Sequence, residues 1–353
     1  MKITEVDKNF AVSESSGEKV FLDCRTDPME LTGLADRADG SFSRLPQEIE
    51  DVVRAELKWL ARQTSGARLR FRTDSREITL RAKLPSVMLM RHMPLTGSSG
   101  FDVYAGRKLA GICAPVDLNS TTFEQSVKLD SAPDKGGMRD VTVNFPLYNF
   151  VDSLEVGFDH DSTLEPPHAT RYGRVVFYGS SITQGGVASR PGTNYANLLA
   201  KNLDFELYNL GFSGNAFGDE PIADYIASLP MKVFVMDYDF NARSLEELEA
   251  THLPMYLKLR EKQPEAGVIF ITNPVAGVYL SLESAARRNA IVLKTYEYAV
   301  SHGDERVRYI DGASLFGEDE RDTCTTDRSH PNDLGFFRMA RRVEPVLSEL
   351  LAY

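Results

Sequence analysis

The chain has 353 residues, of which 42% are hydrophobic and 26% charged, and its formal net charge is −11. Ordinary globular usage at this length favours two domains and excludes collagen-like, low-complexity and wholly disordered proteins. The acidic balance argues against a nucleic-acid partner, because the phosphate backbone would be repelled.

Cysteine and histidine usage argues against disulfide and metal chemistry. The three cysteines, Cys24, Cys113 and Cys324, are widely spaced, so the sequence offers neither a CxxC metal pair nor a disulfide framework. The six histidines show no HExxH-type spacing. We therefore expect reduced thiols and no metal.

The amino-terminal residues carry no recognisable targeting signal. The stretch from Met1 to Lys8 lacks an apolar h-region and a small-residue cleavage site, and no run of about 18 apolar residues occurs in the chain. These features lead us to expect a cytoplasmic protein with no membrane partner. The sequence does not determine the oligomeric state, and a homo-oligomer is compatible with it.

A period of two marks the amino-terminal half. Leu69 and Phe71 alternate with arginines, and Ile78 and Leu80 alternate with polar residues. The stretch 73–76 between the two runs is rich in turn-forming residues. This pattern predicts a β-hairpin with one buried face.

Further short runs with the same rhythm predict an all-β domain. They lie near 141–145 and 154–158, and apolar residues at helical spacing predict one helix over 49–60. Many short strands with little helix are typical of a sandwich or jelly-roll. We assign this domain to residues 1–165.

A proline-containing connector at 165–172 precedes a different rhythm. Apolar runs that predict strands lie at 175–178, 205–208, 232–236, 268–271 and 307–310. Helices are expected near 193–203, 219–228, 244–262, 282–301 and from Asn332 onward, the last kinked or broken at Pro345. Five such units predict an α/β domain over 172–353, with a five-stranded parallel sheet and helices on both faces. Ligands bind such sheets at the carboxyl ends of the strands.

The loop after the first of these strands carries a candidate nucleophile. It reads Gly179-Ser180-Ser181-Ile182-Thr183, a small-residue turn from strand into helix. Such a turn can expose a hydroxyl where helix N–H groups favour negative charge. The alternative is that a serine here only caps the helix.

A second signal lies in the loop before the last helix, in the sequence Asp327-Arg328-Ser329-His330-Pro331. A serine nucleophile needs a base to take its proton, and the imidazole needs a carboxylate to fix its tautomer. Asp and His three residues apart in a turn can face one point. In the alternative interpretation, Asp327 or Ser329 is a helix cap and His330 a surface residue.

Two further loops supply candidates for an oxyanion hole. Gly214, after the second strand, could present its backbone N–H without obstruction, and Asn241, after the third, could present its amide. Acyl transfer needs donors where the carbonyl oxygen becomes anionic. Taken alone, each residue is better explained as a turn residue, glycine for positive φ and asparagine for an Asx-turn.

Four sequence blocks in this order resemble those of the SGNH hydrolase (GDSL esterase/lipase) superfamily. They are the serine block at 179–183, the glycine block ending at Gly214, the asparagine block at Asn241 and the Asp327-x-x-His330 block. The resemblance implies a flavodoxin-like domain with Ser181 as nucleophile, His330 as general base and acid, and Asp327 as the orienting carboxylate. It implies an oxyanion hole made by the Ser181 and Gly214 N–H groups and the Asn241 side chain. It also implies that no metal or organic cofactor is needed.

Two positions depart from that family's pattern. Ser180 stands where the family usually has aspartate, so we expect altered support of the loop and intact chemistry. The third block reads Asp239-Phe240-Asn241-Ala242 instead of Gly-x-Asn-Asp. We expect Asp239 to bond loop amides and to point away from the site.

The sequence Gly100-Phe101-Asp102-Val103-Tyr104 resembles the Gly-x-Asp-Leu-Tyr motif of β-sandwich domains that precede some SGNH hydrolases. Members of that group are mostly carbohydrate esterases, commonly acetyl esterases acting on xylan-type sugars. In this chain we expect Asp102 to bond turn amides and Tyr104 to pack in the sandwich. Trp59 is interpreted as a packing residue.

The leading hypothesis is therefore a serine esterase that removes small acyl groups, acetyl above all, from carbohydrate hydroxyls. It would act through a Ser-His-Asp triad and an acyl-enzyme on a small-molecule or oligosaccharide ester. One alternative is a lipase or thioesterase-type acyl hydrolase of the same fold. Another is a catalytically inactive carbohydrate-binding protein.

Overall fold

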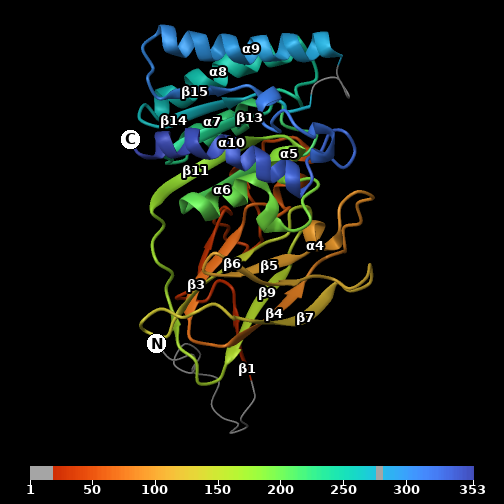
Figure 1. Cartoon of the computed structure of the whole chain (residues 1–353), viewed down its shortest axis with the longest axis vertical. Helices are drawn as coiled ribbons and strands as arrows, with labels where there is room; N and C mark the ends of the chain where they lie inside the picture. The colour runs from red at the N-terminus through yellow and green to blue at the C-terminus, as the bar shows by residue number, and fades with distance from the viewer. Residues whose placement is uncertain (1–18, 276–280) are drawn as a thin grey trace.

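A computed structural model describes residues 19–275 and 281–353, and it has two parts, as Figure 1 shows. The first part of the chain forms a β-sandwich, and the remainder forms a parallel sheet between two layers of helices. In both views helices α6 (Tyr195–Leu203) and α10 (Asp333–Leu351) lie between that sheet and the sandwich.

The sandwich consists of two antiparallel sheets that enclose an apolar interior. One sheet has the order β1-β9-β4-β7, and the other has the order β10-β3-β8-β5-β6 with β2 paired to β3. The strands are β1 (Lys19–Asp23), β2 (Glu30–Thr32), β3 (Arg68–Thr73), β4 (Glu77–Lys83), β5 (Phe101–Ala105), β6 (Lys108–Cys113), β7 (Thr122–Lys128), β8 (Arg139–Asn144), β9 (Ser153–Asp159) and β10 (Leu164–Glu165). The predicted all-β sandwich is confirmed.

The predicted hairpin of β3 and β4 is wrong, although both strands form. β3 pairs with β8, whereas β4 pairs with β7 and β9 in the opposite sheet. The turn between them therefore carries the chain across the sandwich. Leu69 and Phe71 of β3 and Leu80 of β4 belong to the same buried core. Alternation thus identified the buried face of each strand but not its hydrogen-bonding partner.

The single helix predicted over 49–60 is also wrong, because two short helices occupy this stretch. They are α2 (Gln47–Glu50) and α3 (Ala55–Ala61), and a further short helix, α4 (Leu95–Ser98), follows β4. The break places Arg54 in an extended conformation, from which its guanidinium reaches Asp219 at 2.7 Å. The helical spacing of apolar residues over 49–60 is therefore not enough to give one continuous helix, because the break allows Arg54 to contact the other domain.

The carboxy-terminal part confirms the predicted five-stranded parallel sheet. Its strand order is β12-β11-β13-β14-β15, and all four strand pairs are parallel. The strands are β11 (Tyr172–Gly179), β12 (Phe205–Gly211), β13 (Val233–Asp237), β14 (Gly267–Ile271) and β15 (Val307–Ile310). Because β11 lies between β12 and β13, the loop that follows it lies between the loops after those two strands.

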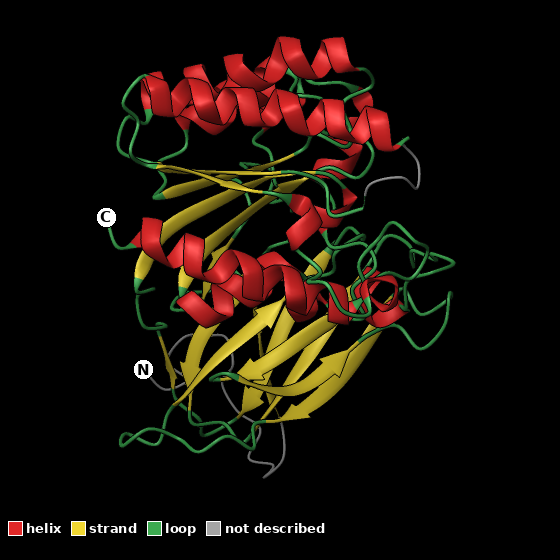
Figure 2. Ribbon diagram, turned by 45° about the horizontal axis from the view of Figure 1, so that its top comes forward, coloured by secondary structure: helices red, strands yellow, loops and turns green. Residues whose placement is uncertain are grey.

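Helices cover both faces of this sheet, as Figure 2 shows. One face packs against α6 and α10, and the other against α7 (Glu220–Ser228), α8 (Leu245–Lys262) and α9 (Leu282–Ser301). Short elements complete the domain, namely α5 (Ser181–Gln184) and the 3-10 helices η1 (Pro191–Thr193), η2 (Gly312–Ser314) and η3 (Arg321–Cys324). α10 continues through Pro345, so the helix is not broken there, and the alternative of a kink stays a prediction. Over the described residues, no helix has the length and apolarity that a membrane span requires.

The Gly100–Tyr104 motif joins the two domains. Asp102 is fully buried in β5, and its carboxylate accepts hydrogen bonds from the Gly192 N–H at 2.7 Å and from Arg190 at 2.8 Å. Asn144 donates to its other oxygen. Burial raises the pKa of Asp102, although the bonds from Asn144 and Arg190 oppose that shift. Asp102 therefore bonds a turn amide, as expected, but the turn belongs to the other domain.

Replacing Asp102 with alanine is expected to destabilise the protein by about 3 kcal/mol, because buried donors lose their acceptor and Arg190 its counter-charge. Urea denaturation of the purified variant measures this loss. Asp152→Ala is the matched control. Asp152 is exposed, and its contact with Lys83 is a long one of 4.0 Å; exposed ion pairs of this kind contribute little to stability. Equal stability losses in the two variants would contradict the structural role of Asp102.

Candidate active site

The nucleophile candidate, Ser181, lies just beyond the carboxyl end of β11. β11 ends at Gly179, where an added Cβ would lie 2.1 Å from the Thr183 hydroxyl oxygen, so the tight turn requires glycine. Ser180 caps α5 by accepting a hydrogen bond from the Ile182 N–H at 3.2 Å. Ser181 is then the first residue of α5, with 8% of its surface exposed. Ser180 therefore serves as the cap, and the Ser181 hydroxyl does not.

Ser181, His330 and Asp327 form a continuous chain of hydrogen bonds. The distance from Ser181 Oγ to His330 Nε2 is 2.9 Å, and that from His330 Nδ1 to Asp327 Oδ2 is 2.7 Å. These contacts join the loop after the first parallel strand to the loop before the last helix. The structure thus brings together the three side chains that sequence analysis selected.

The loop that carries His330 is shaped by Asp327. The second oxygen of Asp327, Oδ1, accepts hydrogen bonds from the N–H groups of Ser329 at 3.0 Å and of His330 at 2.7 Å. Burial by itself would raise the pKa of Asp327, but the hydrogen bonds from the backbone and ring of His330 outweigh it and lower that pKa. The helix cap of α10 is Asn332. Asp327 is therefore an ionised carboxylate that orients the imidazole.

Gly214 and Asn241, the remaining predicted site residues, lie on neighbouring loops. Gly214 has a positive φ of 65° in a turn closed by the bond from the Asn215 N–H to the Phe212 carbonyl. The Asn241 carbonyl oxygen accepts from the Ala216 N–H at 3.4 Å, which leaves the amide NH2 group as the donor on this side chain. In the described structure, neither Gly214 nor Asn241 is hydrogen bonded to Ser181.

Two buried carboxylates lie behind the nucleophile loop, at the end of β13. Asp237 accepts hydrogen bonds from the Thr183 hydroxyl at 2.9 Å and the Tyr195 hydroxyl at 2.8 Å, so it anchors α5. Burial raises its pKa, and the nearby Asp239 raises it further. Asp239 accepts from the Asn273 N–H at 3.3 Å, in keeping with the expected bond to a loop amide. Sequence analysis did not select Asp237.

The β-sandwich domain contributes directly to this site. The Tyr148 hydroxyl donates to the backbone carbonyl of Ser181 at 3.2 Å, and the Ser65 hydroxyl donates to the carbonyl of Gln184. The Gln184 side chain in turn bonds Gln63 and accepts from the Ser213 N–H, next to Gly214. The nucleophile loop is therefore held between the two domains.

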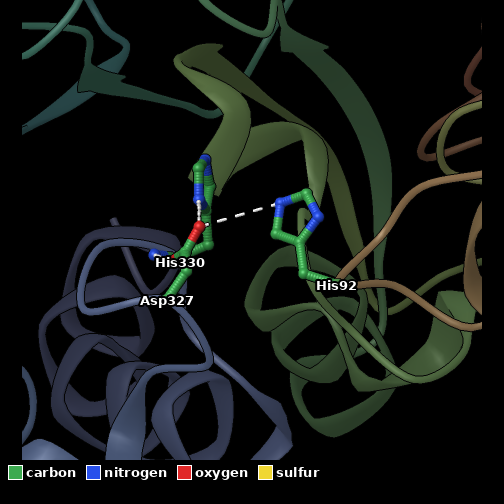
Figure 3. A group of neighbouring side chains, drawn as sticks. All are labelled: His92, Asp327 and His330. Carbon is green, nitrogen blue, oxygen red and sulfur yellow. Dashed lines mark hydrogen bonds and ion pairs between the residues drawn. The ribbon is translucent and has the colours of Figure 1, made fainter.

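His92 is a neighbour of Asp327 and His330 that sequence analysis missed. It lies between β4 and α4, and its Nε2 is 3.7 Å from Asp327 Oδ2 (Figure 3). Its ring meets the His330 ring edge to face, with centroids 5.6 Å apart. Asp327 therefore faces one imidazole from its own loop and a second from the other domain. A lone histidine in a turn-rich segment gave no signal of this position.

The same three residues include the atoms that a metal ion would use. Over the described residues, His92, Asp327 and His330 have ligand atoms within 4.8 Å of one another. Asp327 Oδ2 already accepts from His330 Nδ1 at 2.7 Å. A metal ion at this place would compete with the hydrogen bond that orients His330.

A cavity of about 550 Å³ lies beside the nucleophile loop. Its lining residues come from both domains and are mainly apolar: Ala55, Glu56, Trp59, Leu60, Gln63, Met88, Met90, Tyr148, Ser213 and Asn215. Ser213 and Asn215 flank Gly214, and Tyr148 bonds the backbone of Ser181. Trp59 packs against Phe150 but is 47% exposed, so it presents a large apolar surface to this cavity.

Family comparisons agree with this architecture. The profile of the GDSL-like lipase/acylhydrolase family matches residues 172–348, and that of the N-terminal domain of SGNH-hydrolase-type esterases, named for its GxDLY motif, matches residues 20–164. The chain belongs to the GDSL-like lipase/acylhydrolase family. The resemblance drawn from the four sequence blocks and the Gly100–Tyr104 motif is confirmed. No curated protein matches the chain.

Solved structures share the two-domain arrangement. A Bacteroides ovatus protein described as a GDSL-like lipase is 25% identical, with a TM-score of 0.83, and the match covers 95% of this chain and 98% of that one. A salicylyl-acyltransferase from a tetracycline biosynthetic pathway is 21% identical, with a TM-score of 0.78 and coverage of 94% and 97%. An acetyl xylan esterase from Butyrivibrio proteoclasticus is 12% identical, with a TM-score of 0.60 and coverage of 94% and 99%. The fold and family together support a hydrolase of the esterase class.

Proposed function

We propose that the protein is a serine esterase with Ser181 as nucleophile. The observation that supports this role is the hydrogen-bond chain from Ser181 through His330 to Asp327. His330 Nε2 takes the hydroxyl proton as Ser181 Oγ attacks the ester carbonyl carbon, and the carbonyl oxygen becomes anionic. The N–H groups of Ser181 and Gly214 and the amide of Asn241 stabilise that oxyanion.

The second half of the cycle uses the same groups in reverse. The tetrahedral intermediate collapses, the bond to the alcohol oxygen breaks, and His330 returns the proton to the leaving alcohol. A water molecule, deprotonated by His330, then attacks the acyl-Ser181 ester and releases the acid. Asp327 remains ionised throughout and stabilises the imidazolium that forms at each step.

Covalent labelling tests this proposal against that of an inactive carbohydrate-binding protein. A fluorophosphonate reacts with a serine only when a neighbouring base activates it. We expect one label per chain, located at Ser181 by peptide mapping, with Ser180 unmodified. His330→Ala should lose the label while remaining folded. Labelling at another residue, or no labelling of the native protein, would contradict an activated Ser181.

For the substrate, we propose a carbohydrate ester that carries a small acyl group, with acetyl first. This proposal is supported by the GxDLY-type amino-terminal domain and by the shared fold with an acetyl xylan esterase. Acetate release from a panel of acetylated oligosaccharides tests it. Hydrolysis of simple acetate esters without release from any acetylated sugar would limit the proposal to the esterase mechanism.

A larger acyl group is the second candidate, and the cavity beside Trp59 favours it. An acetyl group fills little of about 550 Å³, and apolar walls favour apolar groups. A series of esters of one alcohol with acyl chains of two to about twelve carbons separates the candidates. A maximum of kcat/KM at acetate supports the deacetylase, whereas a maximum at eight carbons or more supports a lipase or thioesterase-type enzyme.

A further inference from the structure

A second cavity lies between the two domains, beneath α6. Its volume is about 300 Å³, and it shares no lining residue with the triad or with the cavity beside Trp59. From the sandwich domain it is lined by residues of β3, β8, the β5–β6 turn and the connector, and from the other domain by α6 and the residues around it. Its polar lining residues include Arg68, Arg70, Arg107, Asn197 and Lys201.

Positive charge is concentrated around this cavity. Four cationic side chains, Arg68, Arg70, Arg107 and Lys201, line it in a chain whose net charge is −11. Two carboxylates, Asp140 and Asp204, also line it. Asp140 bonds the imidazole of His168, and Asp204 accepts from the Arg171 N–H. The cations therefore outnumber the acids locally, and both acids have other hydrogen-bond donors.

Arg68 and Lys201 have no carboxylate within ion-pair distance among the described residues. Over residues 19–275 and 281–353, neither side chain forms an ion pair, whereas Arg70 lies 3.8 Å from Glu30. Arg68 is 8% exposed, and its side chain donates a hydrogen bond to the Phe205 carbonyl at a long 3.5 Å. Lys201 Nζ lies 5.1 Å from the centre of the Tyr104 ring. Burying a cation without a counter-charge is costly, because it loses hydration and gains little in return.

At both residues burial outweighs the pull of the carboxylates that lie further away, which are Asp204 and Asp102 for Arg68 and Asp102 for Lys201. Burial, with a contribution from Arg70, lowers the pKa of Arg68 to about 10, although Asp204 and Asp102 oppose this shift. Burial also lowers the pKa of Lys201, and the positive charges of Arg190 and Arg107 lower it further. An anion within reach of these two groups would reverse both effects.

Asn197 provides an independent observation. It is 3% exposed, it lines the same cavity, and neither the nitrogen nor the oxygen of its side-chain amide has a hydrogen-bond partner among the described residues. Buried amides are rarely left in this state, because each unsatisfied polar atom costs about 1–3 kcal/mol. A ligand that accepts a hydrogen bond from the amide NH2 group would remove part of that cost.

We propose that this cavity binds a small molecule that carries a tetrahedral oxyanion, of the phosphate or sulfate type. Arg68 and Lys201 supply the charge, and the Asn197 NH2 group supplies a neutral donor. A volume of about 300 Å³ corresponds to on the order of ten water molecules, so the cavity has room for the free anion or for a small organic group attached to it. The site is separate from the proposed esterase chemistry and does not depend on it.

Calorimetric titration of the full-length chain tests the proposal. Sodium phosphate and sodium sulfate are titrated in separate experiments, with sodium chloride at matched ionic strength as the reference. We expect saturable binding of phosphate, sulfate or both at one site per chain, and no saturable heat with chloride. Lys201→Ala should raise the dissociation constant about tenfold or more, because a hydrogen-bonded charge is lost.

Lys294→Ala is the matched control for the change in net charge. Lys294 lies on α9, is 74% exposed, and does not line the cavity. The Lys294→Ala variant should bind the anion with the affinity of the unaltered protein, because solvent and salt screen exposed charges that are far from the cavity. If Lys201→Ala does not fold, Arg107→Ala on the exposed β5–β6 turn takes its place, and a weaker affinity is again expected. Absence of saturable binding of both anions overturns the proposal, as does equal weakening in the cavity and control variants.

Discussion

Replacing Ser181 with alanine is expected to lower ester hydrolysis by about 10⁴-fold or more, while leaving the protein folded. The hydroxyl is the atom that attacks the ester in the proposed mechanism, and no other group can form the acyl-enzyme at that position. Among the described residues, the only hydrogen bond of this hydroxyl is the partly buried one to His330 Nε2. Loss of this bond should therefore change the stability little.

The measurement is the rate of acetate release from a chromogenic acetate ester, with thermal unfolding as the check on folding. Ser180→Ala is the matched control, because it removes a hydroxyl from the adjacent residue. Ser180 caps α5, so this variant should lose about 1 kcal/mol of stability and keep clear esterase activity. An unchanged rate in Ser181→Ala would remove Ser181 from the mechanism.

The sequence was sufficient to predict the α/β domain because its local signals agree with its tertiary structure. The inner strands β13 and β14 are short, fully buried and mainly apolar, and each long helix begins at a capping residue such as Ser244, Ser281 or Asn332. Pro345 was the exception. Helix α10 continues past it because Val343 and Leu347, on either side, are fully buried against the sheet. Packing therefore compensates for the hydrogen bond that proline cannot form.

Strand pairing in the sandwich could not be predicted in the same way. The alternation of apolar and polar residues predicts which side chains of β3 and β4 are buried, and both predicted faces are in the core. The alternation does not predict whether the next strand pairs with the preceding one or crosses to the opposite sheet. That choice depends on long-range contacts, such as those of β3 with β8, which are distant in sequence.

At the candidate site, too, local motifs could be predicted from the sequence, whereas contacts made by the other domain could not. Ser181, Asp327 and His330 could be selected because each belongs to a motif with its own chemical logic. His92 and Tyr148 could not, because each is a single residue in a loop of the other domain that reaches the site only after the domains pack. Asp237 lies two residues before the Asp239–Ala242 block, and a buried carboxylate at a strand end carries no local sign that it anchors Thr183.

Replacing Asp327 with asparagine is expected to lower kcat by about 10⁴-fold. Asparagine has the same shape, so its oxygen can still accept the N–H groups of Ser329 and His330 that shape the loop. Its NH2 group would then face His330 Nδ1, where Asp327 Oδ2 now accepts. This arrangement favours the tautomer with the proton on Nε2, which cannot take the proton of Ser181.

The matched control for this change is Asp333→Asn, six residues further along the chain. Asp333 accepts hydrogen bonds from the Ser189 N–H at 2.9 Å and the Thr193 hydroxyl at 2.7 Å, but it does not contact His330. A far smaller loss of kcat is therefore expected in this variant, with unfolding measured for both. If Asp327→Asn instead keeps the kcat of the unaltered enzyme, a group other than Asp327 must set the imidazole tautomer. His92, 3.7 Å from the same carboxylate oxygen, would then be the first residue to replace, because it also lies against the His330 ring.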